Sequence, residues 1–305
     1  MLYFFRFRIA RNAIKVILRG NYIMTKFALV VDNLNSEEAR KLYNEAQNSF
    51  ETLLLTDLSK LLFILEKGNP PKVLFEGNDI SDINILMIRS SRNNKVAKAV
   101  LAHVFHNLGA NIIDPTERFP IGFASKLLST ISRHKKNCII DTYLSFSRQS
   151  TLNLISHLNT DRKLFIKPIN SSQSRGIEIV ENLSQLRNIS NNFSFTHKND
   201  NIPLYIQKFI DIDKEYRMFM VNGKIITSMK KIRRESGGIK YKRMRFTRLA
   251  EFVIEHVSKT GVLGIDACQD TDGNFYIIEA NRSPMFHYLE DRTGINISKE
   301  IFNNL

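Results

Sequence analysis

The chain has 305 residues, of which 43% are hydrophobic and 24% charged, so it is long enough for two or three lobes with buried cores. Two cysteines exclude a disulfide framework and a zinc pattern, which favours a reducing, cytoplasmic location, and no apolar run approaches the roughly 18 residues of a membrane span. The net charge of +14 calls for an anionic partner, which could be ATP, an acidic peptide, nucleic acid or a membrane surface.

Residues 1–23 carry five basic side chains and no acidic one. An amphipathic, arginine-rich, acid-free segment can serve as a targeting or membrane-surface leader. We interpret these residues instead as an over-called start, because Met24 precedes the first convincing strand.

Strand and helix patterns alternate over residues 24–120. Apolar runs predict strands at 27–31, 53–55, 73–75, 83–88 and 112–113, and helical periodicity predicts helices at 36–48 and 93–108. This alternation predicts a mainly parallel α/β lobe. His103 and His106 lie three residues apart in the second helix, where packing or solvation is favoured over a metal pair because no third ligand is in view.

Two lysines accompany short apolar strands in the middle of the chain. Lys126 lies in a helix expected at 121–134, before a strand at 139–144, and by itself reads as a helix-surface lysine. Lys167 ends a strand and is followed by a loop at 170–176 that contains Ser172, Ser174 and Gly176. Such a loop lets backbone N–H groups approach a phosphate, and a lysine adds a point charge. An ordinary hairpin loop is the alternative.

A further apolar strand at 204–210 contains Gln207, Lys208 and Phe209 and leads into the acidic segment 211–217. Arg217 begins the strand 217–221, and Asn222-Gly223 predicts a tight turn into the next strand.

The segment 228–248 is the most basic part of the chain, with one acidic residue, Glu235. A charge run of this kind is usually a solvated loop. It could also neutralise a phosphate or an acidic co-substrate, whereas the lack of an aromatic stacking pattern disfavours nucleic acid. A helix is expected at about 246–260, and the segment 286–305 reads as a closing helix. The basic residues are Lys230, Lys231, Arg233, Arg234, Lys240, Lys242, Arg243, Arg245 and Arg248.

The segment 261–284 reads GVLGIDACQDTDGNFYIIEANRSP, with two apolar runs around Asp272-Gly273. Asp-Gly between such runs predicts a two-residue hairpin turn, which would place Asp266 opposite Glu279. Glu279 and Asn281 would project from one face of their strand. Two carboxylates and an amide oxygen suit a hard cation such as Mg²⁺. A solvated surface hairpin is the alternative.

Asp266, the Glu279-Ala280-Asn281 triplet and the following Ser283-Pro284 resemble the metal-binding end of ATP-grasp ligases. The resemblance is closest to the RimK-like branch, which joins an amino acid or peptide amine to a carboxylate. It covers about residues 121–305. It implies an α/β (α+β) ATP-grasp fold with an N-terminal α/β pre-ATP lobe at 24–120 and an ATP-grasp domain at 121–305. The latter would divide into a nucleotide-covering lobe at about 145–207 and a C-terminal lobe at about 208–305.

The resemblance also implies ATP and Mg²⁺, or Mn²⁺ in its place, as cofactors, with Asp266, Glu279 and Asn281 as the metal ligands. Arg217, Arg243 and Arg282 are implied to act on the substrate. The residues implied to bind the nucleotide are Lys126, Lys167, Ser172, Ser174, Gly176, Gln207, Lys208, Phe209 and Glu215.

The sequence departs from the family pattern in three places. Asp141 stands where proline is frequent, Ser172 and Ser174 occupy glycine positions, and Lys208 stands where glutamate is common. These departures leave the placement of the nucleotide loop and linker unchanged, but they put the flexibility of the loop in question.

The implied reaction forms an acylphosphate from a carboxylate and ATP, and an amine then displaces phosphate. An acidic small molecule, peptide or protein would be the substrate. The alternatives are an ATP-grasp kinase that phosphorylates a hydroxyl and a non-catalytic basic protein that binds nucleic acid. The sequence makes no prediction of the oligomeric state.

Overall fold

The computed structural model describes residues 25–89, 95–113, 138–158, 163–167, 178–197, 200–201, 203–233, 239–243, 247–257, 259–281 and 283–305. The predictions for residues 1–23, Lys126, Ser172, Ser174, Gly176 and Arg282 lie outside these described residues. By its internal contacts the chain divides into two units. Unit 1 comprises Met1–Gly122, Arg217–Ile265 and Ala280–Leu305, and unit 2 comprises Phe123–Tyr216 and Asp266–Glu279.

Unit 1 contains a parallel sheet in which the strands follow the order β2-β1-β6-β7. The chain passes from β1 to β2 on one side and later returns to β6 on the other, so the order reverses between β1 and β6. All three pairings are parallel, which confirms the α/β lobe that the alternating pattern predicts. The strands are β1 (Lys26–Val31), β2 (Thr52–Thr56), β6 (Ile85–Arg89) and β7 (Asn111–Ile112).

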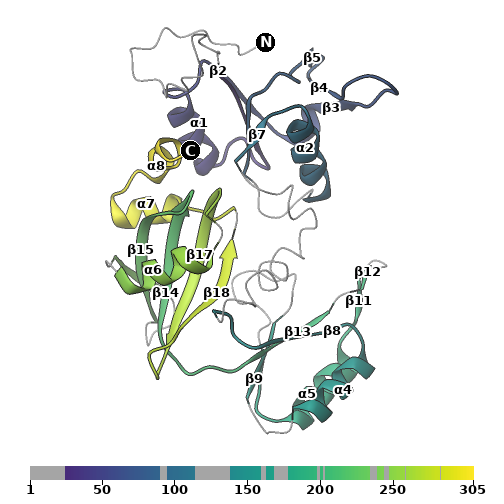
Figure 1. Ribbon diagram of the computed structural model, residues 1–305, viewed down its shortest axis with the longest axis vertical. Helices are drawn as coiled ribbons and strands as arrows, with labels where there is room; N and C mark the ends of the chain where they lie inside the picture. The colour runs from purple at the N-terminus through teal and green to yellow at the C-terminus, as the bar shows by residue number, and fades with distance from the viewer. Residues whose placement is uncertain are drawn as a thin grey trace. The chain divides into compact units, whose positions relative to one another are not determined.

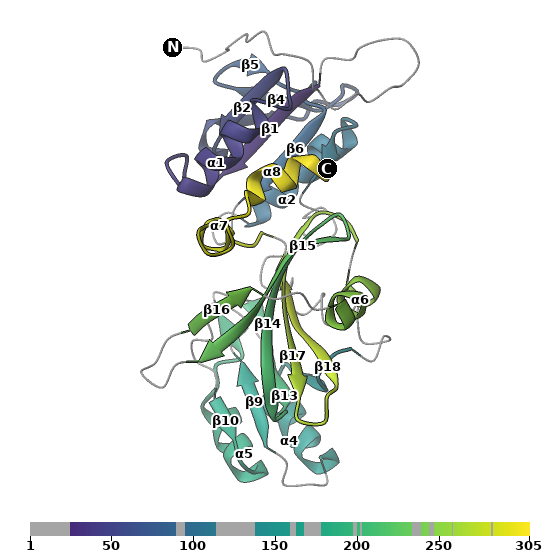
Figure 2. The same ribbon diagram turned by 90° about the vertical axis from the view of Figure 1, so that its left-hand side faces the viewer.

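Side chains alternate along β1, so its two faces bury different partners. The odd-numbered residues of β1 pack with α1 (Glu37–Ala46) and α8 (Ile297–Asn303), and the even-numbered ones pack with α2 (Lys95–Asn107). Figures 1 and 2 show these helices on the two sides of the sheet. Helix α1 begins where the sequence predicts, because the side chain of Ser36 accepts a hydrogen bond from the N–H of Ala39 at 3.1 Å.

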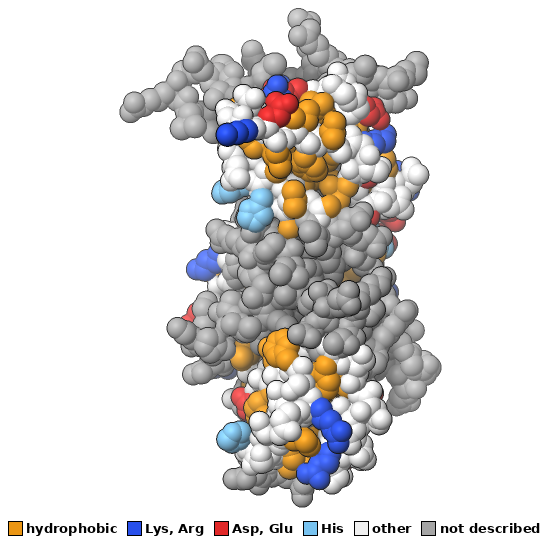
Figure 3. All heavy atoms as spheres, turned by 90° about the vertical axis from the view of Figure 1, so that its right-hand side faces the viewer, with side chains coloured by type: hydrophobic (Ala, Val, Ile, Leu, Met, Phe, Trp, Pro, Cys, Tyr) orange, Lys and Arg blue, Asp and Glu red, His pale blue; other side chains and the backbone are white. Residues whose placement is uncertain are grey.

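A small antiparallel sheet is inserted between β2 and β6 in the chain, and the sequence predicts only its middle strand. It has the order β3-β4-β5, and a turn of 3₁₀ helix, η1 (Leu58–Lys60), precedes it. Leu62 and Leu65 are 57% and 68% exposed, and Figure 3 shows hydrophobic side chains gathered on the side where this sheet and α2 lie in Figure 1. The strands are β3 (Leu61–Ile64), β4 (Lys72–Phe75) and β5 (Asn78–Asp79).

A five-stranded sheet has the order β16-β15-β14-β17-β18, and β14, β17 and β18 contribute residues to both units. Asn222 and Gly223 have φ values of 43° and 85°, which confirms the tight turn predicted between β14 and β15. The strands are β14 (Ile212–Val221), β15 (Lys224–Arg233), β16 (Ile239–Arg243), β17 (Val262–Asp270) and β18 (Phe275–Asn281).

The helices of the C-terminal part of unit 1 are α6 (Thr247–His256), α7 (His287–Thr293) and α8. The expectation of one closing helix at 286–305 is wrong, because Gly294 adopts a left-handed conformation with φ of 65° and ends α7. Phe286, Leu289, Ile301 and Phe302 are buried in the same core as α1, so this C-terminal segment packs on the N-terminal sheet.

Unit 2 contains a four-stranded sheet in the order β10-β9-β13-β8, in which β13 pairs antiparallel with both of its neighbours. Two helices, α4 (Arg148–His157) and α5 (Leu183–Asn192), pack Ile155 and Leu186 against this sheet. Among the residues described, no helix of either unit is long and apolar enough to cross a membrane. The strands of this four-stranded sheet are β8 (Thr142–Ser145), β9 (Leu164–Lys167), β10 (Glu178–Val180) and β13 (Leu204–Lys208). A separate two-stranded sheet is formed by β11 (Thr196–His197) and β12 (Asp200–Asn201).

Candidate active site

The β17–β18 hairpin turns over three residues, 271–273, and not over the two that the sequence predicts. The N–H of Asp270 donates to the carbonyl of Asn274 at 3.0 Å, and the N–H of Gly273 donates to the carbonyl of Asp270 at 3.1 Å. Gly273 has φ of 89°, as the third residue of such a loop requires. The predicted two-residue turn would pair Thr271 with Asn274, but Asp270 takes that place, so the prediction is wrong by one residue. The N–H of Thr271 donates instead to the carbonyl of Asp211 at 3.1 Å.

This correction changes the count that placed Asp266 opposite Glu279. A regular ladder continued from the Asp270–Asn274 pair puts Ile278 opposite Asp266. The predicted facing of the two carboxylates therefore requires a β-bulge farther along the hairpin, and it stays a prediction. Glu279 and Asn281 are two residues apart in β18, so their side chains share a face, and both are half-buried, as is Asp266.

Asp270 anchors the turn, a role that the sequence analysis does not assign. Its carboxylate accepts hydrogen bonds from the N–H of Asn274 (2.7 Å), the amide of Asn274 (3.0 Å) and the hydroxyl of Tyr276 (3.1 Å). Burial raises the pKa of Asp270, but these hydrogen bonds outweigh it and hold the pKa below its usual value. Burial, and then the bond to Asp270, raise the pKa of Tyr276. An aspartate at the first position of a turn is the signal that would have indicated this role.

Arg217, on β14, reaches across the neighbouring strand at Gly264. A Cβ atom added at Gly264 would collide with the Cβ of Pro284 and lie 2.9 Å from Nη2 of Arg217. Glycine in the interior of a strand often marks such close approaches, and this is the sequence signal that could have indicated the contact at Gly264. The guanidinium of Arg217 therefore lies beside the segment that follows β18.

In unit 2, Lys167 lies at the end of β9 and is bonded to the next strand. Its ammonium donates to the side-chain carbonyl of Gln207 at 2.5 Å. Gln207 is buried, and its amide donates to the hydroxyls of Thr142 (2.9 Å) and Tyr205 (3.0 Å). Because Thr142 and Tyr205 hold the amide of Gln207, its carbonyl oxygen fixes the position of the Lys167 ammonium.

The linker after β13 lines a pocket of about 290 Å³ formed by Lys163, Lys208, Phe209 and Asp211. Phe209 stacks on Phe165 with ring centroids 5.0 Å apart, and the Lys163 ammonium lies 5.8 Å from the Phe209 centroid. The N–H of Lys208 donates to the carbonyl of Asp141 (2.9 Å), and the N–H of Phe209 donates to the carbonyl of Lys163 (3.0 Å). The backbone of Lys208 and Phe209 can thus present carbonyl oxygens, but not these N–H groups, to a ligand.

Glu215 and Arg243 are the two remaining predicted residues that the structure describes. Glu215 is half-buried on β14. Arg243, at the end of β16, is exposed and donates to the carbonyl of Thr293 at 3.3 Å, near the C-terminus of α7. A cation at the C-terminus of a helix is favoured by the helix dipole, so the guanidinium of Arg243 stabilises the end of α7.

The oxygen donors of β17 and β18 have the right chemistry for Mg²⁺. Magnesium takes oxygen ligands and commonly uses one or two carboxylates together with phosphates. In the described part of the chain, no group of three or more His, Cys, Asp and Glu side chains could hold a metal ion. A metal at the predicted site would therefore depend on two carboxylates, Asp266 and Glu279, and on the amide oxygen of Asn281.

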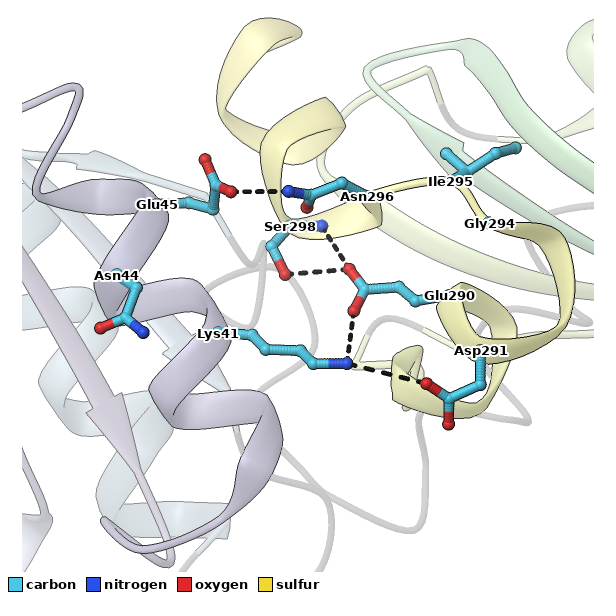
Figure 4. Close-up of a pocket in the computed structure, with 9 residues that line it drawn as sticks. All are labelled: Lys41, Asn44, Glu45, Glu290, Asp291, Gly294, Ile295, Asn296 and Ser298. Atoms are coloured by element: carbon cyan, nitrogen blue, oxygen red, sulfur yellow. Dashed lines mark hydrogen bonds and ion pairs between the residues drawn. The ribbon is translucent and has the colours of Figure 1, made fainter.

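A second pocket, of about 370 Å³, lies in unit 1 between α1 and the α7–α8 segment (Figure 4). Its charged groups are bonded within the pocket: Lys41 bonds to Glu290 at 2.8 Å, and Glu290 accepts from the N–H and hydroxyl of Ser298. The carboxylate of Glu45 accepts from the side-chain amide of Asn296 at 2.6 Å. Hydrogen bonds to Glu290 and then Glu37 raise the pKa of Lys41. None of the predicted site residues lines this pocket, which reads as a structural tie between α1 and the C-terminal helices.

Comparison with solved structures gives the same fold at low sequence identity. The ATP-grasp ligase PsnB, solved with a phosphomimetic variant of its minimal precursor, Mg and ADP, has a TM-score of 0.69 and 11% identity, covering 92% of this chain and 98% of PsnB. A RimK domain ATP-grasp protein from Sphaerobacter thermophilus has a TM-score of 0.64 and 17% identity over 92% and 99% of the two chains. The macrocyclase MdnC from Microcystis aeruginosa, solved with its precursor peptide MdnA, has a TM-score of 0.60 and 14% identity over 91% and 98%.

No curated protein sequence matches the chain. A family model described as the RimK-like ATP-grasp domain matches residues 125–305, which is more than half of the chain and includes the linker after β13 and the β17–β18 hairpin. The chain therefore belongs to the RimK-like ATP-grasp family and is an ATP-dependent ligase.

Proposed function

We propose that the protein joins a carboxylate to an amine through an acylphosphate, at the expense of ATP. The observation that carries this proposal is the placement of three half-buried oxygen donors, Asp266, Glu279 and Asn281, on adjacent strands of one sheet. Carboxylate and amide oxygens are the ligands that Mg²⁺ prefers, and an ATP-bound Mg²⁺ commonly takes one or two protein carboxylates together with the phosphates.

ATP would bind in unit 2, between the Lys167 ammonium and the linker pocket. Lys167 is fixed by Gln207 and offers positive charge to a phosphate, while Phe209 offers an aromatic face within the pocket. The neighbours PsnB and MdnC belong to the same fold, and PsnB was solved with Mg and ADP. Lys126 and the 170–176 loop would add further phosphate contacts.

Mg²⁺ would be held by Asp266, Glu279 and Asn281, with Mn²⁺ as an alternative of similar ligand preference. The bound ion would supply neutralisation of charge on the ATP phosphates. The residues of the chain would act mainly by holding the reacting groups in place, since neither step requires a covalent enzyme nucleophile.

The reaction has two steps that balance without an oxidant or reductant. The substrate carboxylate attacks the γ-phosphorus of ATP, ADP leaves, and an acylphosphate forms. The amine then attacks the acyl carbon, loses a proton, and inorganic phosphate leaves. The guanidinium of Arg217 would stabilise the negative charge of the acylphosphate and of the tetrahedral oxyanion, with Arg282 and Arg243 as further candidates.

The carboxylate substrate would be an acidic peptide or protein segment. The β15–β16 hairpin places Lys230 directly opposite Lys242 and carries further basic residues. Like charges directly opposite in a sheet are destabilising, so an anionic partner at this hairpin would relieve a cost in the free protein. PsnB and MdnC were solved with precursor peptides, which agrees with a peptide substrate.

The experiment incubates the protein with ATP, Mg²⁺ and the peptide fraction of its source, followed by mass spectrometry. A product that has lost one water, together with ADP and inorganic phosphate, would support the ligase. A peptide that gains a phosphoryl group, with ADP and no inorganic phosphate, would contradict it and identify a kinase. Hydroxylamine added in place of the amine should trap the acylphosphate as a hydroxamate.

A further inference from the structure

Arg89 is the last residue of β6, beside its register partner Val31 on β1. Arg89 thus lies at the carboxyl end of the parallel sheet, on one of the two strands between which the strand order reverses. Open parallel sheets bind their ligands at such a point. The side chain of Arg89 is only 3% exposed. A guanidinium buried so deeply needs partners that compensate its lost hydration.

Those partners come from two distant parts of the chain. Nε of Arg89 donates to Oε1 of Glu38 at 3.1 Å, and Nη2 donates both to Glu38 and to the carbonyl oxygen of Pro284. The ring of Phe286 lies 5.8 Å from the guanidinium carbon. Nη1 is buried and has no hydrogen-bond partner among the residues that the structure describes. Arg89 thus connects the first turn of α1 to backbone three residues beyond Asn281.

Pro284 is also held on a second side. Its Cβ lies so close to Gly264 of β17 that no side chain fits there, and Nη2 of Arg217 approaches the same glycine. Arg89 therefore holds the carbonyl group of Pro284, while Gly264 of β17 packs against the proline ring. The segment that leaves β18 is therefore held at a point close to Asn281, the last residue of that strand.

Stability alone does not account for a buried arginine at this place. Burying the Arg89–Glu38 pair removes the hydration of two charges, and apolar side chains of similar volume are often as stable. A guanidinium instead offers donors in several fixed directions, so that one side chain can bond a carboxylate and a carbonyl together. That geometry suits a residue whose task is to position another segment.

We propose that Arg89 is a positioning residue for the metal-binding end of β18: by holding Pro284 against Gly264, it orients Asn281. This inference rests on the proposed function, in which Asn281 is a metal ligand. Residues that orient a metal ligand without touching the metal typically change metal affinity by about 10–100-fold when they are replaced.

The test measures the Mg²⁺-dependent part of nucleotide binding. ADP is titrated by calorimetry in Mg²⁺ and again in EDTA, and the ratio of the two affinities gives the gain due to the metal. In the double variant Arg89→Met/Glu38→Gln this gain should fall about tenfold, while ADP affinity in EDTA stays unchanged. Both charges are removed together so that the Glu38 carboxylate is not left buried alone. Arg89→Lys keeps the positive charge but cannot donate hydrogen bonds in as many fixed directions. Its Mg²⁺-dependent gain in ADP affinity should lie between those of the parent and the double variant.

Lys41→Met is the matched control. Lys41 ties the same helix, α1, to α7 through Glu290, as Figure 4 shows, and its loss also removes one cation from that helix. This variant should be less stable than the parent but should keep the full Mg²⁺-dependent gain.

An unchanged gain in the double variant would overturn the proposal and leave Arg89 a structural residue. If the double variant does not fold, Arg89→Lys is titrated instead, and an unchanged Mg²⁺-dependent gain in that variant would overturn the proposal. A parent protein that binds ADP equally with and without Mg²⁺ would overturn the metal site itself, and the role of Arg89 with it.

Discussion

The ammonium of Lys167 donates a hydrogen bond to the side-chain carbonyl of Gln207 across 2.5 Å, between the neighbouring strands β9 and β13. Lys167→Ala should weaken ATP binding by roughly 1.5–3 kcal/mol, because a charge-assisted contact to a phosphate is lost. Lys208→Ala should have a much smaller effect, since the Lys208 side chain is 41% exposed and its ion pair with Asp141 is 3.8 Å long. Nucleotide titrations of the two variants check this ranking, and the reverse order would mean that the linker and the loop are misassigned.

Replacing Asp270 should change the acid stability of the protein. The pKa of Asp270 is lower in the folded state than in the unfolded chain, so its contribution is full above its unfolded pKa of about 3.9 and is lost as the pH falls through the folded value. The parent should therefore lose more stability than Asp270→Asn between about pH 6 and about pH 3. Urea unfolding at several pH values measures this difference, and parallel curves for the two proteins would refute the assignment.

Gly264→Ala should destabilise unit 1 by about 1–3 kcal/mol, because its methyl group has no space between Pro284 and Arg217. Gly68→Ala is the matched comparison: no atom lies within 4 Å of its added Cβ, and only its positive φ of 81° opposes the change. Only Gly264→Ala should also reduce ligase activity in the protein that remains folded. Equal activity in the two folded variants would contradict the role given to the Gly264–Pro284 contact.

The double variant Lys230→Ala/Lys242→Ala should move stability and substrate binding in opposite directions. Removing a directly opposed pair of like charges should leave the free protein equally or more stable. Binding of an acidic peptide should weaken and lose part of its dependence on salt. Melting curves and peptide titrations at two salt concentrations test both effects. Unchanged peptide affinity would place the acidic substrate elsewhere.

Much of the fold of unit 1 could be predicted because its signals are local. The apolar run that becomes β1, the Ser36 cap of α1 and the Asn222-Gly223 turn each specify a conformation through their own residues. The strand β3 was missed, although its short apolar run Leu61–Ile64 is of the same kind as the run that becomes β1. The segment 286–305 was predicted as one helix because the capping signal of Gly294, which ends α7, was not taken into account.

The geometry of the candidate site could not be predicted from the sequence. The spacing of Asp266, Glu279 and Asn281 indicates a hairpin, but whether that hairpin turns over two or three residues depends on the bond from Asp270 to Asn274. Arg89 and Pro284 lie 195 positions apart in the sequence, and their contact depends on how the C-terminal segment packs on the N-terminal sheet. Single-sequence patterns carry no information on such a contact.

Glu279→Gln tests whether Glu279 binds the metal that accompanies ATP, on which the proposed reaction depends. The substitution keeps the size of the side chain and removes one negative ligand, so folding should be nearly unchanged while ADP release falls by orders of magnitude. Mg²⁺–ATP should raise the melting temperature of the parent by mass action and that of the variant much less. If Glu279→Gln keeps both full activity and the full shift in melting temperature with Mg²⁺–ATP, the metal site is not on β18 and the proposed reaction is contradicted.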